Sequence, residues 1–233
     1  RYSDRISRNL SVEGMRSEGQ LCWIKRALIS GQRTMISLWG FPRKKNTYPF
    51  AGYRAVLGNI YQSIMRKPKA VVLDLGFGSG RLTARLYEKG CTVYGQDFSE
   101  RMIELAAQKM PEARLYQGDF AEGLAEPLLR ERYDFIIATY SLHHLGDEQK
   151  ILLLQALRKL LNPGGQLLIG DVMFEDREKL EQCRREVGDA WDEEEIYFVV
   201  DELKQMFPEF RFEKISFCAG VLELDCEALR ARE

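Results

Sequence analysis

The chain has 233 residues, 45% of them apolar and 11% aromatic, which suffices for one well-packed core of ordinary size. Its five cysteines are odd in number and lack a CxxC pair, which argues against a disulfide framework or a zinc cluster. No stretch has the ~18 to 20 uncharged apolar residues that a membrane span needs. We therefore expect a soluble cytoplasmic protein with ordinary thiols and no contact with a membrane.

The net charge of −1 combines two oppositely charged parts. Residues 1–69 carry 14 Lys and Arg but only 3 Asp and Glu, a net charge of +11, which leaves −12 for the remainder. Such a basic segment either binds a polyanion such as RNA or forms a helical layer whose charges face solvent or the acidic body. The second interpretation is favoured, because the segment lacks the dense basic cluster and aromatic run of nucleic-acid binders.

Apolar residues follow helical spacing in the first part of the chain, over 21–28 and again over 56–64, with a loop at 39–53 between them. Strand-like alternation is absent from this part. We expect residues 1–67 to form an N-terminal helical cap or lid and residues 68–233 to form the main domain.

From residue 70 onward, short apolar runs alternate with helical patterns. We expect strands at 70–75, 92–97, 113–117, 134–139 and 166–172, and helices near 80–89, 99–110, 122–131 and 147–161. Ser99 and Asp147 can cap helix N-termini, and the NPGG stretch at 162–165 can turn the last helix back into the sheet. The alternation indicates a parallel sheet with crossover helices.

The pattern changes after Asp171. Two helical stretches, at 175–188 and 194–207, lead to two apolar runs at 210–218 and 221–226. These runs are close enough in sequence for an antiparallel hairpin that turns at Ala219 and Gly220. A mostly parallel sheet that ends in a hairpin differs from the six parallel strands of a nicotinamide dehydrogenase.

The stretch DLGFGSGRL, which begins at Asp74, raises the question of which ligand its glycine turn holds. Gly76, Gly78 and Gly80 alternate, and Arg81 stands where a dinucleotide-binding G-x-G-x-x-G motif has its third glycine. No Lys-Ser or Lys-Thr follows, which excludes a P-loop. Asp74 ends its strand, where α/β sheets bind ligands, and can accept hydrogen bonds from a cationic amine.

Five motifs together resemble the class I S-adenosylmethionine-dependent methyltransferases, and among them small bacterial members that are mostly uncharacterised. The motifs are YPFAGYRAVL, DLGFGSGRLT, VYGQDFSERMIELA, QGDF and YSLHHL, and the resemblance covers residues 48–226. It implies an α/β, Rossmann-like, seven-stranded mostly parallel sheet with an antiparallel C-terminal hairpin strand, helices on both faces and an N-terminal helical cap. It also implies S-adenosylmethionine as methyl donor and S-adenosylhomocysteine as product.

The resemblance assigns cofactor-binding roles to the glycine turn and to the end of the second strand. The backbone of Gly76, Phe77 and Gly78 would pass beneath the methionine part, where a Cβ would collide. Asp97 would accept both ribose hydroxyls, unless it only caps the next helix. Phe98 would pack on the adenine face, unless it is a core phenylalanine.

Further cofactor contacts are implied after the third and fourth strands. Asp119 would accept from the exocyclic amine of adenine, and the backbone of Phe120 would address the ring, unless the segment is only a polar turn. Thr139 and Tyr140 resemble positions whose backbone meets the ligand's amino group and whose side chains face the substrate.

Aromatic residues near the end of the cap are expected to close the site. Tyr48, Phe50 and Tyr53 fall where relatives place aromatics over the cofactor, and Trp39 with Phe41 could cover the methyl group. Each could instead pack helix against sheet. The chain departs from its relatives here, since LWGFPRKKN stands where W-x-x-x-Y-D is expected, so the shape of the lid stays open.

The only two histidines, His143 and His144, lie in SLHHLGD after the fourth strand. One of them could be a general base for a hydroxyl or amine nucleophile, because the pKa of histidine is near neutrality. Alternatively, the pair only shapes the pocket. No Cys, Asp or Glu set with ligand spacing surrounds them, so no metal is expected.

Methyl transfer is an in-line displacement at carbon, so positioning and desolvation can supply much of the catalysis. The chain lacks the N/D-P-P-Y/F tetrapeptide of amino-methylating nucleic-acid enzymes and a Pro-Cys nucleophile for pyrimidine C5 chemistry. We therefore predict a methyltransferase (EC 2.1.1.-) that acts on a small-molecule acceptor. The alternatives are an RNA-modifying methyltransferase that uses the basic N-terminal layer and a non-catalytic protein that binds S-adenosylmethionine.

Overall fold

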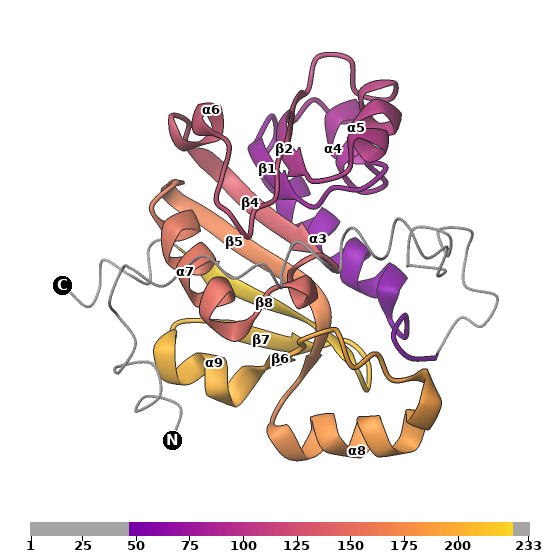
Figure 1. The fold of residues 1–233 in the computed structure, drawn as a ribbon. Coiled ribbons are helices and arrows are strands. Elements are labelled where there is room, and N and C mark those ends of the chain that lie inside the picture. The colour runs from indigo at the N-terminus through magenta and orange to yellow at the C-terminus, as the bar shows by residue number, and fades with distance from the viewer. Residues whose placement is uncertain (1–46, 226–233) are drawn as a thin grey trace. The chain divides into compact units, whose positions relative to one another are not determined.

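The computed structural model describes residues 47–225, which form a β-sheet with helices on both faces (Figure 1). The strands are β1 (Val71–Leu75), β2 (Thr92–Asp97), β3 (Arg114–Gln117), β4 (Tyr133–Thr139), β5 (Leu161–Phe174), β6 (Phe198–Val199), β7 (Arg211–Lys214) and β8 (Ala219–Asp225). The helices are α3 (Tyr53–Met65), α4 (Thr83–Glu88), α5 (Glu100–Ala107), α6 (Glu126–Leu129), α7 (Asp147–Arg158), α8 (Arg177–Val187) and α9 (Val200–Met206), with 3-10 turns at Leu142–His144 and Gly188–Ala190.

The strand order is β3-β2-β1-β4-β5-β8-β7, and the two-residue β6 pairs with the end of β5. Strands β1 to β5 pair in parallel, whereas β8 is antiparallel to both β5 and β7. The predicted seven-stranded, mostly parallel sheet with an antiparallel C-terminal strand is therefore confirmed. Because the parallel strands share one carboxyl edge, the loops that follow β1, β2 and β4 meet at that edge.

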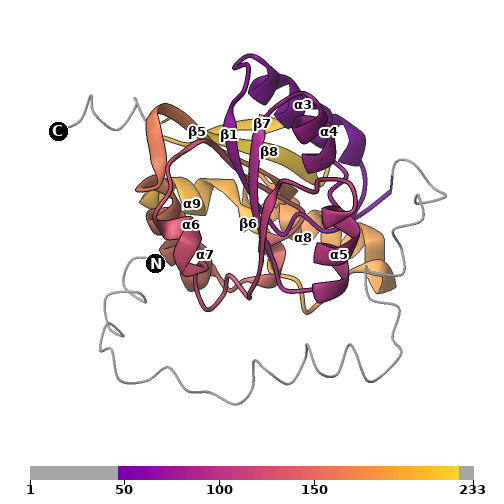
Figure 2. The ribbon, with the colours of Figure 1, turned by 90° about the horizontal axis from the view of Figure 1, so that it is seen from above.

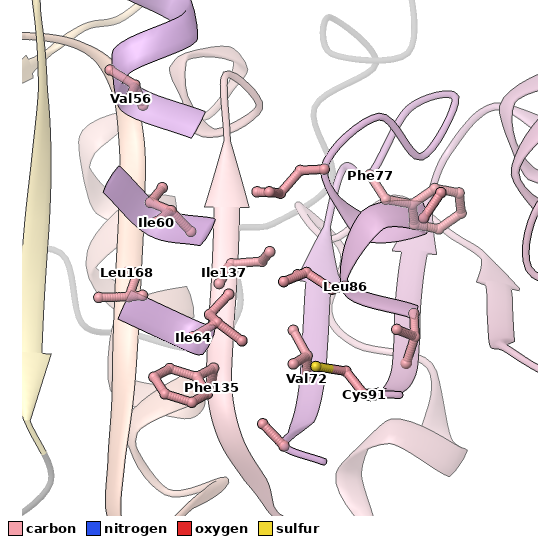
Figure 3. Close-up of a cluster of buried hydrophobic side chains, with 14 of the residues drawn as sticks. Val56, Ile60, Ile64, Val72, Phe77, Leu86, Cys91, Phe135, Ile137 and Leu168 are labelled. Atoms are coloured by element: carbon pink, nitrogen blue, oxygen red, sulfur yellow. The ribbon is translucent and has the colours of Figure 1, made fainter. Parts of the chain in front are cut away.

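Helix α3 covers β5 and β8 through one apolar face. Val56, Ile60 and Ile64 recur at every fourth position and are fully buried, as the predicted helical spacing over 56–64 requires. Figure 3 shows Ile60 and Ile64 near Leu168 of β5, with Val56 farther along the same helix. The helix approaches closely because β5 has Gly170 there, where a Cβ would lie 2.3 Å from Cγ1 of Val56.

The sheet is buried on both faces, which explains the continuous apolar runs of its strands. Val72, Phe135 and Leu168 belong to the cluster beneath α3 and α4 (Figure 3). Their neighbours Leu73 and Leu167 are fully buried too, and by strand alternation they point to the opposite face. Figure 2 shows α3 and α4 on one side of the sheet and α7 and α9 on the other.

The compact unit that contains the sheet begins at Tyr48. The apolar patch at 21–28 and the aromatic residues Trp39 and Phe41 lie outside the described residues, so the predicted N-terminal cap stays a prediction. Among the described residues, no helix is long and apolar enough to cross a membrane.

The helix predicted over 122–131 was too long, because only Glu126–Leu129 is helical. The preceding residues are held in a loop by Gln96, whose side-chain amide donates to the carbonyl of Gly123 and accepts from the backbone N–H of Ala125. The side chain of Gln96, from β2, thus overrides the helical pattern of the residues before α6.

The helix predicted over 194–207 begins only at Val200. Residues before it are extended, since Phe198–Val199 pairs with the end of β5 and the backbone N–H of Ile196 donates to the carbonyl of His143. These contacts place the segment over the loop that follows β4.

The C-terminal hairpin exists, but its turn was predicted at the wrong residues. Ala219 and Gly220 lie in β8, and the turn closes where the N–H groups of Ile215 and Ser216 donate to the carbonyl of Ala219. Gly220 serves packing, because a Cβ there would lie 2.4 Å from the ring of Phe212. The NPGG stretch lies within β5, as an irregularity between its pairs with Tyr133 and Phe135.

We predict that Ile60→Ala destabilises the fold by about 2–5 kcal/mol, because it removes a fully buried side chain from the contact between α3 and β5. Denaturant unfolding of the full chain measures the loss. The control is Gln62→Ala on the exposed face of the same helix, which should change stability by no more than about 0.5 kcal/mol. Equal losses in the two variants would contradict the packing of α3 on the sheet.

Candidate active site

The glycine turn connects β1 to α4 at the carboxyl edge of the sheet. Gly76, Gly78 and Gly80 have φ angles of 71°, 53° and 74°, in the left-handed region that favours glycine. A Cβ on Gly76 would lie 2.4 Å from Cβ of Ser141, in the loop after β4. The turn therefore needs glycine at position 76 for its own packing, before any ligand is considered.

Phe77 and Gly80 take part in packing around this turn. The ring of Phe77 is buried beneath β2, where a Cβ on Gly95 would lie 2.5 Å from it. A Cβ on Gly80 would lie 3.0 Å from Cε of Met110. Because its ring is buried, Phe77 could contact a ligand only through its backbone. The role predicted for Phe77 likewise involves only its backbone.

Asp74 carries an unpartnered polar atom beside the turn. Its Oδ2 accepts a hydrogen bond from the Thr83 hydroxyl, whereas its Oδ1 is buried with no hydrogen-bond partner among residues 47–225. Burial raises the pKa of Asp74 to about 7, the charge of Asp97 adds to this rise and the Thr83 hydroxyl opposes it. A buried acceptor without a donor costs free energy, which a bound donor would recover.

Asp97 ends β2 and fixes the turn through both carboxylate oxygens. Oδ2 accepts from the backbone N–H of Gly78 at 2.8 Å, and Oδ1 accepts from that of Ser99 at 2.9 Å. The side chain of Ser99 caps α5, as predicted. Burial raises the pKa of Asp97. Each oxygen keeps a further acceptor site, so the predicted bonds to ribose hydroxyls remain chemically available.

The side chain of Phe98 is 42% exposed, so the alternative of a core phenylalanine is wrong. Asp119 accepts a hydrogen bond at 2.8 Å from the backbone N–H of Ala121 and so forms the polar turn that was weighed for this segment. The ring of Phe120 is buried and would lie 3.6 Å from a Cβ on Gly76. Phe120 therefore lies beside the glycine turn, and the roles of all three residues stay predictions.

The strand β4 ends in a strained tyrosine. Tyr140 has a φ of 53°, unusual for a residue with a side chain, and its backbone N–H donates to the carbonyl of Gly170. Its hydroxyl is buried with no hydrogen-bond partner in the described part of the chain. Thr139, at the end of β4, is half-buried.

Tyr53 of α3 faces the same edge. Its ring lies 5.0 Å from that of Tyr140. Burial raises the pKa of Tyr53, the charge of Arg81 lowers it and that of Asp74 raises it. Tyr48 lies elsewhere: its ring stacks on Trp191 at 5.3 Å. Of the three predicted lid aromatics, Tyr53 is the one that these contacts bring to the turn.

His143 is fully buried between two carboxylates. Its Nδ1 lies 2.6 Å from Oδ1 of Asp171, and its Nε2 lies 3.6 Å from Oε1 of Glu195. Burial lowers the pKa of His143, but the charge and hydrogen bond of Asp171 and the charge of Glu195 outweigh burial and raise it. The residue His144 is exposed, but burial of its imidazole, together with the charge of His143, lowers its pKa to about 3.

Sequence reasoning missed Asp171 and Glu195. Asp171 stands in β5 and also accepts from the backbone N–H of Leu142, so it holds the histidine loop against the strand. Its place near the end of a buried strand was the one available signal. Glu195 had none, because it comes from a segment that the pattern assigned to a helix.

Comparisons with known proteins show the family to which the chain belongs. A family model described as a methyltransferase domain matches residues 72–165. An uncharacterized methyltransferase of Geobacillus thermodenitrificans is 37% identical over 176 residues, which are 72% of this chain and 78% of that protein. The chain belongs to the class I S-adenosylmethionine-dependent methyltransferases. An uncharacterized methyltransferase of Anoxybacillus flavithermus is 36% identical, over 68% of this methyltransferase and 74% of the relative.

Solved structures share the fold at low sequence identity. The magnesium protoporphyrin IX methyltransferase of Synechocystis PCC 6803, with bound S-adenosylhomocysteine, has a TM-score of 0.64 and 18% identity, over 86% of this methyltransferase and 96% of that chain. The N-methyltransferase NodS of Bradyrhizobium japonicum has a TM-score of 0.57 and 16% identity, over 79% and 91%.

We predict that the affinity for S-adenosylmethionine rises about tenfold between about pH 6 and about pH 8. Burial raises the pKa of Asp74 in the free protein to about 7, so below that pH the carboxyl would be mostly neutral and would attract an ammonium group of the ligand weakly. Above it the carboxylate is charged in advance of binding. Calorimetry in buffers of different ionisation enthalpy measures both the affinity and the protons released.

The Asp74→Asn variant is the control for this pH dependence. It keeps the side chain's size but cannot titrate, so its affinity should be weaker and nearly independent of pH. A variant with the wild-type pH slope would assign the titration to another group.

Proposed function

We propose that this methyltransferase binds S-adenosylmethionine at the carboxyl edge of β1, β2 and β4 and transfers its methyl group to a small-molecule acceptor. The observation that carries the binding site is Oδ1 of Asp74, a buried acceptor without a partner among the described residues, beside a glycine turn. The ammonium of the ligand's methionine part would supply the missing donor.

The residues around the turn fit the rest of the cofactor. The backbone of Gly76, Phe77 and Gly78 would face the methionine part. Asp97 would accept from the ribose with the acceptor sites that its two backbone bonds leave, and the exposed ring of Phe98 would cover adenine. The other proposed contacts are Gly80, Asp119, Phe120, Thr139, Tyr140 and Tyr53.

Once bound, the cofactor supplies a methyl group on a positively charged sulfur. The protein's part is to align the acceptor and to keep water out. Tyr53 and Tyr140, whose rings lie 5.0 Å apart, would form the wall between α3 and β4. The unpartnered hydroxyl of Tyr140 would bind a polar group of the cofactor or the acceptor.

The two histidines differ in burial, which favours one of them as the predicted general base. His143 is fully buried and held by Asp171, so we assign it a positioning role. His144 has the exposed side chain, so it is the one that an acceptor can reach. The general-base proposal therefore applies to His144, whose pKa of about 3 keeps the ring neutral and able to accept a proton at pH 7 but makes it a weak base.

Two observations support a small acceptor. Residues 139–142, at the end of β4 and directly after it, read TYSL. They lack the N/D-P-P-Y/F tetrapeptide of amino-methylating nucleic-acid enzymes. Proteins of the same fold include a magnesium protoporphyrin IX methyltransferase. The RNA alternative depends on the charge of residues 1–69, and most of these lie outside the described residues.

We predict that Asp97→Ala weakens binding of S-adenosylhomocysteine by about 10- to 100-fold, equal to about 1.4–2.7 kcal/mol. Asp97 also fixes Gly78, so the loss alone would not identify a ribose contact. The 2′-deoxyribose and 3′-deoxyribose analogues resolve this ambiguity. Each should bind the wild type more weakly than the parent ligand, and Asp97→Ala should bind all three with similar affinity.

Additive losses would contradict the ribose contact. If Asp97 only fixes the turn, the deoxy analogues lose the same affinity in the wild type and in Asp97→Ala. The variant's thermal unfolding, measured without ligand, reports separately how much the turn itself is disturbed.

Turnover tests the acceptor class. We expect S-adenosylhomocysteine to form with at least one small amine, hydroxyl or thiol compound in a broad metabolite screen, and not with transcribed RNA. RNA affinity that falls steeply with salt, together with methyl incorporation into RNA, would favour the RNA alternative. Binding of the cofactor without turnover of any acceptor would favour a non-catalytic protein.

A further inference from the structure

We propose that His143, His144 and Glu195 bind a divalent transition-metal ion such as Zn²⁺. One ligand atom from each side chain lies within 4.8 Å of the other two. Nε2 of His143 is buried with no hydrogen-bond partner among the described residues, and it lies 3.6 Å from Oε1 of Glu195. In the neutral ring Nε2 carries a lone pair close to a carboxylate, and a metal ion that displaces the competing proton would bridge the two.

The supporting contacts are those that metal ligands need. Nδ1 of His143 lies 2.6 Å from Oδ1 of Asp171, which fixes the tautomer so that Nε2 carries the lone pair. The carboxylate of Asp171 is itself held by the backbone N–H groups of Leu142 and Val172. This is the carboxylate–histidine pair that orients imidazole ligands in many metal sites.

Glu195 is oriented in a similar way. Its Oε2 accepts a hydrogen bond at 2.6 Å from the hydroxyl of Tyr197, which leaves Oε1 toward His143. The hydroxyl of Tyr197 is in turn hydrogen-bonded to that of Tyr48. The two segments that carry the ligands are joined by the bond from Ile196 N–H to the carbonyl of His143.

The surrounding charge favours a cation. The carboxylates of Asp171 and Glu195 face His143 from opposite sides. The opposing cation is Lys150, whose Nζ donates to the carbonyl of Ile196 and lies 3.5 Å from Oδ1 of Asp147.

Two imidazoles and one carboxylate indicate the class of ion. Imidazole selects Zn²⁺ and other first-row transition metals over Mg²⁺ and Ca²⁺, and three protein ligands leave a position open for water or another molecule. Ligands of a tetrahedral Zn²⁺ lie about 3.4 Å apart, so the widest pair must close by up to about 1.4 Å. Rotation about the side-chain bonds of the exposed His144 can supply this movement.

The expectation of no metal considered only ligands near the histidine pair in sequence. The third ligand comes from the segment before β6, which the structure places over the loop after β4. A bound ion would occupy His144, so this residue would then be a ligand and could not also be a general base. The metal site does not depend on the proposed acceptor or on cofactor binding.

The test uses the full chain without an affinity tag, stripped of metal with a chelator. Calorimetric titration with Zn²⁺ should give one ion per chain. His144→Ala and Glu195→Gln should each weaken that binding at least tenfold. Glu194→Gln, which makes the same change at an exposed neighbour in the same segment, should bind as the wild type does.

Co²⁺ titration identifies the ligand atoms. A site of nitrogen and oxygen ligands gives visible d–d bands without sulfur-to-metal charge transfer, whereas the cysteines would produce that charge-transfer band. Zn²⁺ should also raise the Tm of the wild type and of Glu194→Gln but not that of Glu195→Gln.

The proposal is overturned if Zn²⁺ fails to bind stoichiometrically, if Glu195→Gln and Glu194→Gln bind it equally, or if sulfur ligation dominates the Co²⁺ spectrum. Since His144 is exposed, His144→Ala keeps the test decisive even if Glu195→Gln does not fold. Binding of S-adenosylmethionine is measured separately, so its failure would affect the proposed function and not the metal site.

Discussion

The carboxylate of Asp97 is the constraint on which the carboxyl edge of the sheet depends. It ties the end of β2 to the glycine turn through Gly78 and to α5 through Ser99. The hydroxyl of Ser141 donates to the carbonyl of Leu75, which ties the loop after β4 to the same turn. A Cβ on Gly76 would collide with Ser141, so the glycine turn and the loop after β4 pack closely together. The ends of β1, β2 and β4 are therefore held in one arrangement before a ligand binds.

Each face of the sheet has a buried carboxylate at this edge, and each carboxylate is associated with a polar atom that has no hydrogen-bond partner among residues 47–225. Asp74 points to the face of α3 and α4 and has one oxygen without a donor. Asp171 points to the opposite face and holds His143, whose other nitrogen has no hydrogen-bond partner among residues 47–225 and lies 3.6 Å from Oε1 of Glu195. Folding gains nothing from a buried polar atom that is left unpaired, so such atoms are expected where a ligand completes the bonding. The two proposed sites rest on these two atoms, and the third such atom among the described residues, the hydroxyl of Tyr140, lies at the end of β4.

The sequence predicted the strands well because each is buried on both faces and therefore reads as a short apolar run. It also predicted the glycine turn with Asp74 and Asp97, since turn residues and strand ends are local features. It failed where distant side chains decide the backbone. Gln96 holds residues 123 and 125 out of a helix, and Phe212 packs on the glycine that was taken for a turn.

The region around His143 shows the same limit most clearly. Its partner Glu195 is 52 positions away, in a stretch whose pattern resembles the start of a helix. That stretch is extended because it forms a bond to the backbone of His143 and a strand pair with β5. Burial raises the pKa of Glu195, and the charge of His143 and the hydrogen bond from Tyr197 oppose this rise. A local sequence pattern cannot predict the position of Glu195, because the contacts that hold its segment come from the histidine loop and from β5, which are distant in sequence.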